Sequence, residues 1–292
     1  MSRWLVIGAS SFTGSHFCRY LRGRGEKVYE TSLRTLLMPG SFDYVVSFAA
    51  LNVVAPSWDH PADYFRVNVQ QQIRFWEELA KIQVRYLHVS TPEVYGSTAG
   101  WVSEEHPYRP STPYAASRAA AEMILKCFHL RYDFPVIMTR ACNVYGPGQQ
   151  LHRLIPKLIV SIKKGVKFKL DGGGASMRSY LHAADVCEAT YLIATKGTPG
   201  EAYHISTTAT QSIYNIAQMV CTKLKVRPVD AIEVVPDRPG KDQAYYLRAE
   251  KLTRLGWEPR IALPAGIDSV IEWVEREWEA LKDQPMEYEF RP

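Results

Sequence analysis

The sequence contains few cysteines and no long run of apolar residues, and each shortage excludes a class of protein. The 292 residues include only 5 cysteines, in neither a C-x-x-C pair nor a metal-ligand spacing. Their odd number does not fit a framework of disulfide bonds, so we expect reduced thiols and no bound metal. No apolar stretch is long enough to span a bilayer, and the first residues lack the pattern of a signal peptide. We therefore expect a cytoplasmic protein with no membrane segment.

The positive charge of the chain is weak and evenly spread. The formal net charge is +5, and the densest basic run is the short segment Lys163–Lys169. This distribution gives little support for a nucleic-acid partner, whereas it suits an anionic small molecule. The contents of 46% hydrophobic and 22% charged residues are those of an ordinary globular protein. Because there are no repeats and no clear linker, we expect the C-terminal half to pack on the N-terminal half.

The N-terminus has the pattern of a dinucleotide-binding unit. An apolar strand at Trp4–Ile7 runs into the glycine-containing turn Gly8–Gly14, and Ser15–Arg22 has helical spacing. In such a unit the turn lets the backbone approach a pyrophosphate, and the helix N-terminus attracts the anion. The sequence therefore predicts cofactor contacts from Gly8, Ser10, Ser11, Phe12, Thr13 and Gly14.

The end of the expected second strand carries no acidic residue. This strand, Lys27–Thr31, leads to Ser32, with Arg34 two residues later. A carboxylate at this point accepts a hydrogen bond from the ribose 2′-hydroxyl of NAD and repels the 2′-phosphate of NADP. Ser32 and Arg34 would tolerate or bind that phosphate, so we expect NAD or NADP with a slight preference for NADP. The simpler interpretation is that Arg34 is only a surface residue.

The stretch Ser111–Ala121 combines helix signals with two reactive side chains. Pro113 restricts Thr112 to extended geometry, and the alanine-rich run that follows favours a helix. Tyr114 and Arg118 would then lie one turn apart on one face. A nearby fixed cation favours the phenolate, so we expect the pKa of Tyr114 to fall from about 10 and Tyr114 to act as a base. For an isolated pair, a packed tyrosine and a solvated arginine would be the simpler interpretation.

A second reactive stretch follows the strand expected at Arg85–Ser90. Parallel strands present ligand-binding residues beyond their carboxyl ends, which places Thr91 and Glu93 at that edge. A carboxylate that faces a pocket of low dielectric has a raised pKa and can exchange protons near neutral pH. The alternative is a solvated glutamate at a strand end.

These stretches form part of a longer series of motifs: the Gly8–Gly14 turn, S-T-P-E-V-Y-G, P-Y-A-A-S-R, R-A-C-N-V-Y-G-P and D-R-P-G-K-D. In this order and spacing they resemble the extended short-chain dehydrogenases, most closely the nucleotide-sugar 4,6-dehydratases. The resemblance implies an α/β fold with a Rossmann-type doubly wound parallel sheet and a smaller C-terminal substrate lobe. It places the cofactor domain at residues 1–143 and the lobe at 144–292, with parts near 176–206 returning to the sheet.

The resemblance also implies a chemistry and a set of roles. Such enzymes oxidise the sugar of a nucleotide-diphosphate sugar at C4 with a bound nicotinamide, remove the C5 proton and eliminate water. The implied catalytic residues are Thr91, Glu93, Tyr114 and Arg118. Ala49, Ser32 and Arg34 join Tyr114 and Arg118 at the cofactor, and the implied substrate contacts are Asn143, Lys157, Arg178 and Arg238.

Two further expectations concern architecture. Only about ten residues separate Ser32 from the apolar strand at Phe42–Ala50, whereas a parallel crossover with its helix needs a dozen or more. We therefore predict that the third strand of the family's sheet is missing. The helices expected at Asp63–Ala80 and Tyr114–Arg131 carry surplus apolar residues, and in similar proteins they pair into the four-helix bundle of a homodimer.

The chain departs from the family pattern at three positions. Arg118 replaces a lysine, Ser11 replaces a glycine, and Pro92 stands where glucose-type dehydratases have an aspartate that acts as the acid. The alternatives are therefore a 4-epimerase, a decarboxylase or a 4-oxidase of the same family, or a relative that binds a nucleotide sugar without turnover. Glu93 favours the dehydratase over the epimerase, because epimerases usually have a small residue there.

Overall fold

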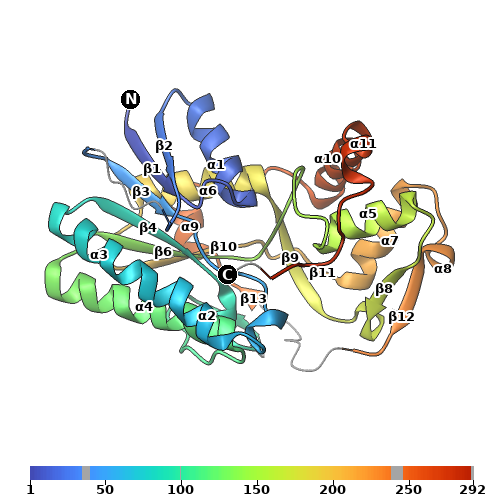
Figure 1. Ribbon diagram of the computed structural model, residues 1–292, viewed down its shortest axis with the longest axis horizontal. Coiled ribbons are helices and arrows are strands. Elements are labelled where there is room, and N and C mark those ends of the chain that lie inside the picture. Colours follow the sequence, from blue (N-terminus) through green and yellow to red (C-terminus); the bar gives the residue numbers. More distant parts are fainter. Residues whose placement is uncertain (35–39, 99, 238–245, 291–292) are drawn as a thin grey trace.

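The computed structural model describes residues 1–34, 40–98, 100–237 and 246–290. Its larger part is built around one sheet with helices on both faces, and a smaller group of helices and strands lies to one side (Figure 1). Within the described residues, none of the helices is both long enough and apolar enough to cross a membrane.

The main sheet has six strands, and every neighbouring pair runs parallel. In spatial order its strands are β10 (Ala202–Ile205), β6 (Val136–Ala141), β4 (Arg85–Ser90), β3 (Tyr44–Ser47), β1 (Arg3–Ile7) and β2 (Lys27–Thr31). The chain passes from β1 to β2 on one side and then to β3 on the other, so the strand order reverses at β1. Ligands bind at such a reversal in open α/β sheets. The predicted Rossmann-type fold is confirmed.

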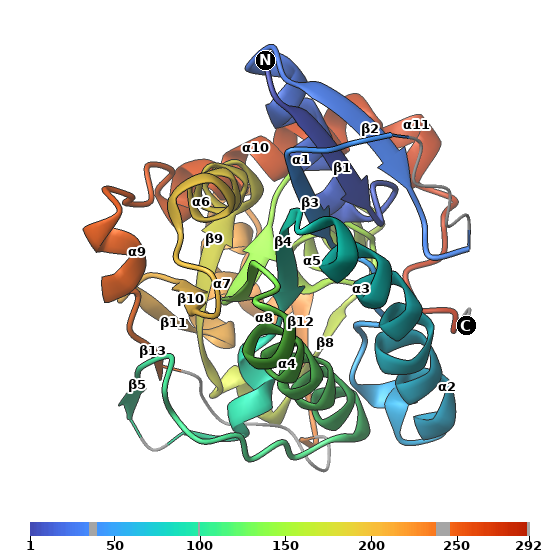
Figure 2. The ribbon, with the colours of Figure 1, turned by 90° about the vertical axis from the view of Figure 1, so that its left-hand side faces the viewer.

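Apolar side chains alternate between the two faces of the sheet, as its burial on both sides requires. On β1, Trp4 and Val6 pack in one core, whereas Leu5 and Ile7 pack in the other. The first core is covered by α1 (Phe12–Gly23) and α6 (Ala183–Lys196), and the second by α3 (Gln71–Ile82) and α4 (Pro113–Tyr132). The two pairs of helices lie on opposite sides of the sheet in Figures 1 and 2.

The strand β2 is the edge of the sheet. Among the described residues it pairs only with β1, and the next strand in sequence, β3, lies on the far side of β1. The described sheet therefore lacks a strand outside β2, as the short connection predicted.

The smaller part has its own hydrophobic core. Its elements are β7 (Asn143–Tyr145), α5 (Leu154–Lys163), β8 (Phe168–Asp171), β9 (Met177–His182), β11 (Thr210–Ser212), α7 (Ile213–Lys223), α8 (Pro228–Ala231), β12 (Ile232–Val235), α10 (Leu263–Arg276) and α11 (Trp278–Leu281). The sheet β11-β9-β7 and the pair β12-β8 pack with α5, α7 and α10 around buried side chains such as Leu158, Val220 and Val270.

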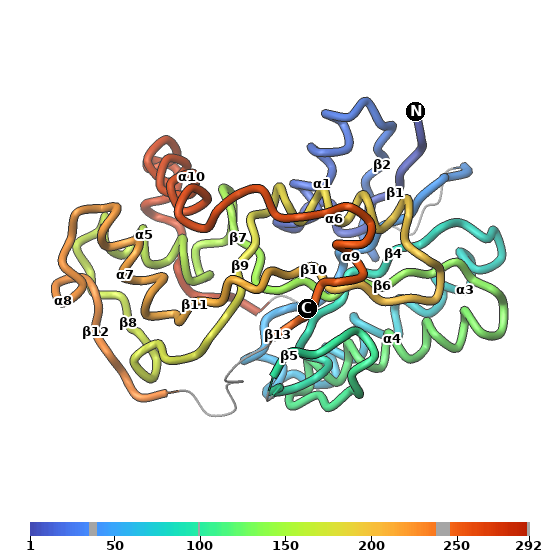
Figure 3. The backbone as a smooth tube through the Cα atoms, turned by 180° about the vertical axis from the view of Figure 1, so that it is seen from behind, coloured from blue at the N-terminus to red at the C-terminus, as the bar shows by residue number. Residues whose placement is uncertain are grey.

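Short elements add to the larger part. α2 (Pro61–Phe65) contacts α4, β5 (Trp101–Val102) pairs with β13 (Tyr246–Leu247), and α9 (Glu250–Arg254) contacts β10. The segment between α9 and α10 crosses α6 (Figure 3). There the carboxylate of Asp185 accepts hydrogen bonds from the backbone N–H groups of Arg260 and Ile261, at 3.2 and 3.0 Å.

The single helix expected at Asp63–Ala80 is interrupted. A π-helical turn at Arg66–Gln70 separates α2 from α3. Inside this turn the buried side chain of Asn68 accepts a hydrogen bond from Leu51 N at 2.8 Å and donates to Ser117 Oγ at 2.9 Å. The wider turn thus directs an amide towards α4, and π-turns of this kind are common beside functional sites.

Candidate active site

A cavity of about 380 Å³ lies at the carboxyl ends of the main strands. It is bounded by residues that follow β1, β3, β4 and β6 on one side and by the start of α5 and β9 on the other. The cavity brings together most of the predicted site residues, namely Ser11, Phe12, Thr13, Thr91, Glu93, Tyr114, Arg118, Asn143 and Arg178. The predicted site residues therefore meet at the point where the strand order reverses.

The glycine turn after β1 requires glycine at both of its ends. Gly8 has φ +75°, and a Cβ atom there would lie 2.8 Å from Ala49 N. A Cβ atom on Gly14 would lie 2.3 Å from Gly8 O. Between them, Ser11 has an ordinary extended backbone, and its Oγ accepts from Gly14 N at 3.2 Å and donates to Gly8 O at 2.7 Å. The serine that replaces glycine thus caps α1, although it also lines the cavity.

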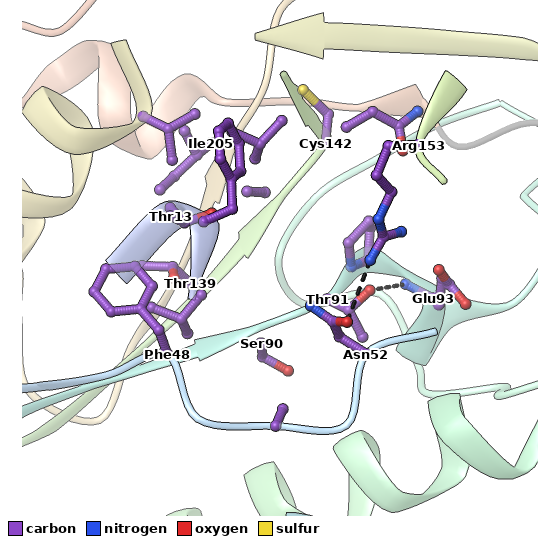
Figure 4. Close-up of a pocket in the computed structure, with 18 of the residues that line it drawn as sticks. Thr13, Phe48, Asn52, Ser90, Thr91, Glu93, Thr139, Cys142, Arg153 and Ile205 are labelled. Atoms are coloured by element: carbon purple, nitrogen blue, oxygen red, sulfur yellow. Dashed lines mark hydrogen bonds between the residues drawn. The ribbon is translucent and has the colours of Figure 1, made fainter. Parts of the chain in front are cut away.

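Thr91 and Glu93 project from a short 3₁₀ turn that follows β4. Thr91 Oγ1 accepts a hydrogen bond from Glu93 N at 3.3 Å and caps this turn (Figure 4). Pro92 occupies the first position of the turn, where a missing N–H group is tolerated. The residue that replaces the family's acid is therefore a structural part of the turn that presents Glu93.

Tyr114 lies in the first turn of α4, where Thr112 Oγ1 caps the helix by accepting from Ala115 N at 3.1 Å. The phenol is 6% exposed. Burial and the charge of Glu93 raise its pKa, and Arg118 and a hydrogen bond with Thr91 only partly oppose this. The predicted fall in the pKa of Tyr114 is therefore wrong for the protein without ligands, because burial outweighs the nearby cation.

Arg118 does share one face of α4 with Tyr114, but its hydrogen bonds go to β4. Its Nη2 donates to His88 Nε2 at 3.0 Å and to the carbonyl oxygen of Val89. The side chain is 2% exposed, and its Nη1 is buried with no hydrogen-bond partner among the described residues. A buried donor without an acceptor is unfavourable by about 1–3 kcal/mol, which a bound polar ligand would relieve.

These features fit a nicotinamide dinucleotide. The α1 N-terminus and its turn would hold the pyrophosphate, because helix N–H groups and the helix dipole favour anions. The first turn of α1 carries no acidic residue that would repel it. The unpartnered Nη1 of Arg118 would donate to a ribose hydroxyl. Ser32 and the exposed Arg34 follow β2, and the backbone N–H of Arg34 donates to Ser32 Oγ at 3.3 Å.

The sequence did not indicate Arg153, which is half-buried in the cavity wall. It stands at the N-cap of α5, and its guanidinium reaches over the cavity to donate to Asn52 Oδ1 at 3.2 Å (Figure 4). Its charge acts on both Tyr114 and Glu93. The sequence contained one signal for Arg153. An arginine directly before a helix is unfavourable beside the positive end of the helix dipole unless its charge is directed away from the helix.

The predicted substrate residues separate into three groups. Asn143, at the start of β7, and Arg178, on β9, line the cavity. Lys157, on α5, is absent from the described lining residues, and its Nζ lies 2.7 Å from Glu287 Oε1. Arg238 lies outside the described residues. Among the described residues, Arg153 and Arg178 are therefore the cationic side chains that line the cavity on the side of the smaller part.

The segment 287–290 packs against residues that lie beside this cavity. Phe290 stacks on His60 with ring centroids 4.1 Å apart and lies 6.2 Å from the ring of Tyr64. Tyr64 in turn meets the Tyr114 ring edge to face at 6.1 Å. With the Lys157–Glu287 ion pair, these contacts connect the larger part to the smaller one.

Fold and cavity together define an extended short-chain dehydrogenase of the nucleotide-sugar-modifying type. A model of the GDP-mannose 4,6-dehydratase family matches residues 30–270, so the chain belongs to this family of 4,6-dehydratase-like proteins.

Individual relatives are similar over most of the chain. The mouse dTDP-D-glucose 4,6-dehydratase is 35% identical over 248 residues, which cover 82% of this chain and 70% of that protein. The dTDP-glucose 4,6-dehydratase of Xanthomonas campestris pv. campestris is 31% identical and covers 94% of this chain and 93% of its own. The solved structure of DesIV, a dTDP-glucose 4,6-dehydratase from Streptomyces venezuelae with NAD bound, superposes with a TM-score of 0.88 at 28% identity, covering 95% and 98% of the two chains.

Proposed function

We propose that this protein is a nucleotide-sugar 4,6-dehydratase, a lyase that works through a bound nicotinamide cofactor. The observation that carries the proposal is the convergence of Thr91, Glu93 and Tyr114 on one cavity at the strand-order reversal. A tyrosine alone would serve any oxidoreductase of this fold. The additional carboxylate beside it supplies the second proton acceptor that a dehydration requires.

Each of these residues has a distinct task. A nicotinamide held by the Gly8–Gly14 turn and Arg118 would supply the hydride chemistry that connects C4 and C6 of the sugar. Tyr114 takes the proton of the C4 hydroxyl, which Thr91 aligns by hydrogen bonding. Glu93 removes the C5 proton, which the new C4 ketone acidifies, and gives it to the departing C6 hydroxyl so that water leaves. A solvent proton delivered through Glu93 then completes C5 when C6 is reduced, and the proton taken by Tyr114 is released to solvent. This double use of Glu93 replaces the acid that Pro92 cannot provide.

The electrostatics of the cavity bear on the Tyr114 step. Because burial raises the pKa of Tyr114, its deprotonation depends on the cations that oppose burial, Arg118 and Arg153. The carboxylate of Glu93 acts in the opposite direction. A cavity with these charges favours the protonated phenol, and the positive charge of a bound oxidised nicotinamide would add to the two cations.

The substrate is a nucleotide-diphosphate sugar. Arg178 would bind the pyrophosphate through charge-assisted hydrogen bonds, and Asn143 would position the sugar. The location of both residues on the cavity wall supports these roles. Arg238 in the D-R-P-G-K-D motif is proposed as a second pyrophosphate ligand.

The cofactor is NAD or NADP. The solved DesIV structure contains NAD. For this chain, Ser32 and Arg34 in place of a carboxylate support tolerance of the 2′-phosphate and a lean towards NADP.

We also infer a homodimer that pairs the α2–α3 and α4 helices of two subunits. Large apolar side chains on these helices face solvent, with Leu130 83%, Met123 54% and Phe65 42% exposed. Exposed large apolar side chains on helices that contact each other support an interaction surface here. Sedimentation at micromolar concentration should give the mass of a dimer, and a monomer alone would contradict the inference.

The reaction is tested by incubating the protein and cofactor separately with dTDP-glucose, UDP-glucose and GDP-mannose. Dehydration predicts a product lighter than its substrate by one water, detected by mass spectrometry. An epimerase would leave the mass unchanged, and a 4-oxidase would reduce cofactor in proportion to product. Carbon dioxide from a nucleotide-linked uronic acid would identify a decarboxylase, and retained ligand without turnover would identify a binding protein.

A further inference from the structure

A chain of buried hydrogen bonds runs behind the cavity from Arg118 to α3. Arg118 Nη2 lies 3.0 Å from His88 Nε2, and His88 Nδ1 lies 3.1 Å from the hydroxyl oxygen of Tyr86. That oxygen accepts a further hydrogen bond from Trp76 Nε1 at 3.0 Å. The side chains of His88, Tyr86 and Trp76 are 0% exposed. Because water cannot reach these side chains, it cannot replace any of the hydrogen bonds between them.

The donors of this chain determine the state of His88. A guanidinium can only donate hydrogen bonds, so His88 Nε2 must accept. The ring is therefore neutral with its proton on Nδ1, from where it donates to the Tyr86 oxygen. A second proton on Nε2 would point at the guanidinium. Burial and the charge of Arg118 accordingly hold the pKa of His88 well below its usual value.

The same contact determines where the charge of Arg118 lies. The arginine side chain loses rotamer entropy when it is fixed in one conformation. Two acceptors on β4, His88 Nε2 and the carbonyl oxygen of Val89, select one position, in which Nη2 is bonded and the buried Nη1 remains without a partner among the described residues. Arg118 also lines the cavity beside Tyr114. His88 is not among the described residues that line the cavity, but its contact orients the guanidinium of Arg118 on the neighbouring helix α4.

We propose that His88 is a positioning residue that holds the Arg118 guanidinium beside Tyr114 and so allows arginine to take part in proton transfer at this site. The proposal rests on the proposed function, since it assigns the charge of Arg118 to the Tyr114 step. It gives a physical reason why arginine is accommodated here: its second nitrogen is bonded to an imidazole that is kept neutral.

The direction of the effect follows from the groups that face Tyr114. Arg118 on the same helix and Arg153 before α5 lower the pKa of the phenol, whereas Glu93 raises it. The Tyr64 ring packs against it from α2. Release of Arg118 removes one of the two cations, so the pKa of Tyr114 rises further. The acid limb of kcat/KM, below which Tyr114 stays protonated, should then move to higher pH.

Two substitutions at the same position separate this role from simple packing. His88→Phe keeps the ring shape without an acceptor, and His88→Gln retains an oxygen acceptor. We expect His88→Phe to move the acid limb up by about half a pH unit or more and to lower kcat about tenfold, with a smaller change in KM. His88→Gln should restore the limb. Equal limbs in all three proteins, with only the melting temperature lowered, would overturn the proposal.

A measurement on the wild-type protein needs no activity. The ¹⁵N shifts of the His88 ring, assigned by comparison with His88→Gln, should show a neutral Nδ1–H tautomer from about pH 5 to 8. In Arg118→Met this tautomer preference should disappear. An Nε2–H tautomer, or titration near the ordinary histidine pKa, would overturn the proposal even if His88→Phe does not fold. Absence of any turnover in the wild type, with the predicted ¹⁵N shifts, would instead refute the dehydratase function and the catalytic part of this role while leaving the contact intact.

Discussion

Arg140 Nη2 lies 2.5 Å from Glu122 Oε2, and both side chains are completely excluded from solvent. The pair connects β6 to α4. Glu122 Oε1 also accepts from Ser90 Oγ at 2.6 Å, and Ser90 immediately precedes Thr91. This buried ion pair therefore helps to hold the end of β4 in place, and that end presents the reactive residues.

Removal of one partner should destabilise the whole protein. Glu122→Gln leaves the Arg140 charge buried and uncompensated, which is expected to lower the free energy of unfolding by about 3–5 kcal/mol. Urea unfolding followed by circular dichroism measures this change. The exposed ion pair Arg227–Asp230 provides the matched control, because Asp230→Asn should leave the transition unchanged. Equal stability of Glu122→Gln and the wild type would contradict the role given to the pair.

The same pair predicts a loss of stability in acid. Burial opposes ionisation of Glu122, but the Arg140 charge and its hydrogen bonds bring the pKa below the usual value of 4.5. A folded-state pKa below the unfolded one stabilises the fold above the unfolded pKa, and this contribution is lost as the pH falls through the folded pKa. Glu122→Gln should therefore have a flatter stability profile below about pH 4.5 than the wild type.

Arg153 should contribute to catalysis through its charge. In Arg153→Gln the pKa of Tyr114 rises because one opposing cation is lost, so the acid limb of kcat/KM moves to higher pH. The loss of a charged hydrogen-bond donor from the cavity corresponds to about 10- to 100-fold in kcat/KM. Arg153→Lys is the charge-matched control and should keep the limb in place. Identical profiles for wild type and Arg153→Gln would show that the guanidinium only closes the wall.

Cofactor preference should depend on the residues that follow β2. If Arg34 binds the 2′-phosphate, Arg34→Ala should weaken NADP binding about tenfold or more and leave NAD binding unchanged. Ser32→Asp should act in the same direction by repelling the phosphate. Titration of both cofactors by calorimetry measures these affinities. Equal affinity for NAD and NADP in the wild type and in both variants would refute the preference.

Local sequence signals predicted the elements that are determined locally. The strands at Lys27–Thr31 and Arg85–Ser90 have the predicted bounds, and Thr112 is extended before Pro113, as the proline requires. The order of strand, glycine turn and helix at the N-terminus also follows from local pattern. The position of Tyr114 at the cavity needed only the motif and the strand order.

Features that depend on distant packing could not be predicted in this way. The pKa of Tyr114 rises because of burial, which only the assembled fold provides. Arg118 bonds to a strand residue 30 positions away, and Lys157 to a residue 130 positions away. The interruption of the helix before α3 depends on Asn68, whose partners lie on other segments. Sequence spacing within one helix contains none of this information.

The central claim is that Tyr114 acts before the C4 ketone exists and Glu93 acts after it. The most direct test compares Tyr114→Phe and Glu93→Gln in deuterated buffer with the nucleotide sugar that the wild type converts. Glu93→Gln should still oxidise C4 and accumulate reduced cofactor, measured by its absorbance, while NMR shows no exchange of deuterium at C5. Tyr114→Phe should form almost no reduced cofactor. Wild-type turnover with C5 exchange in Glu93→Gln would contradict the account.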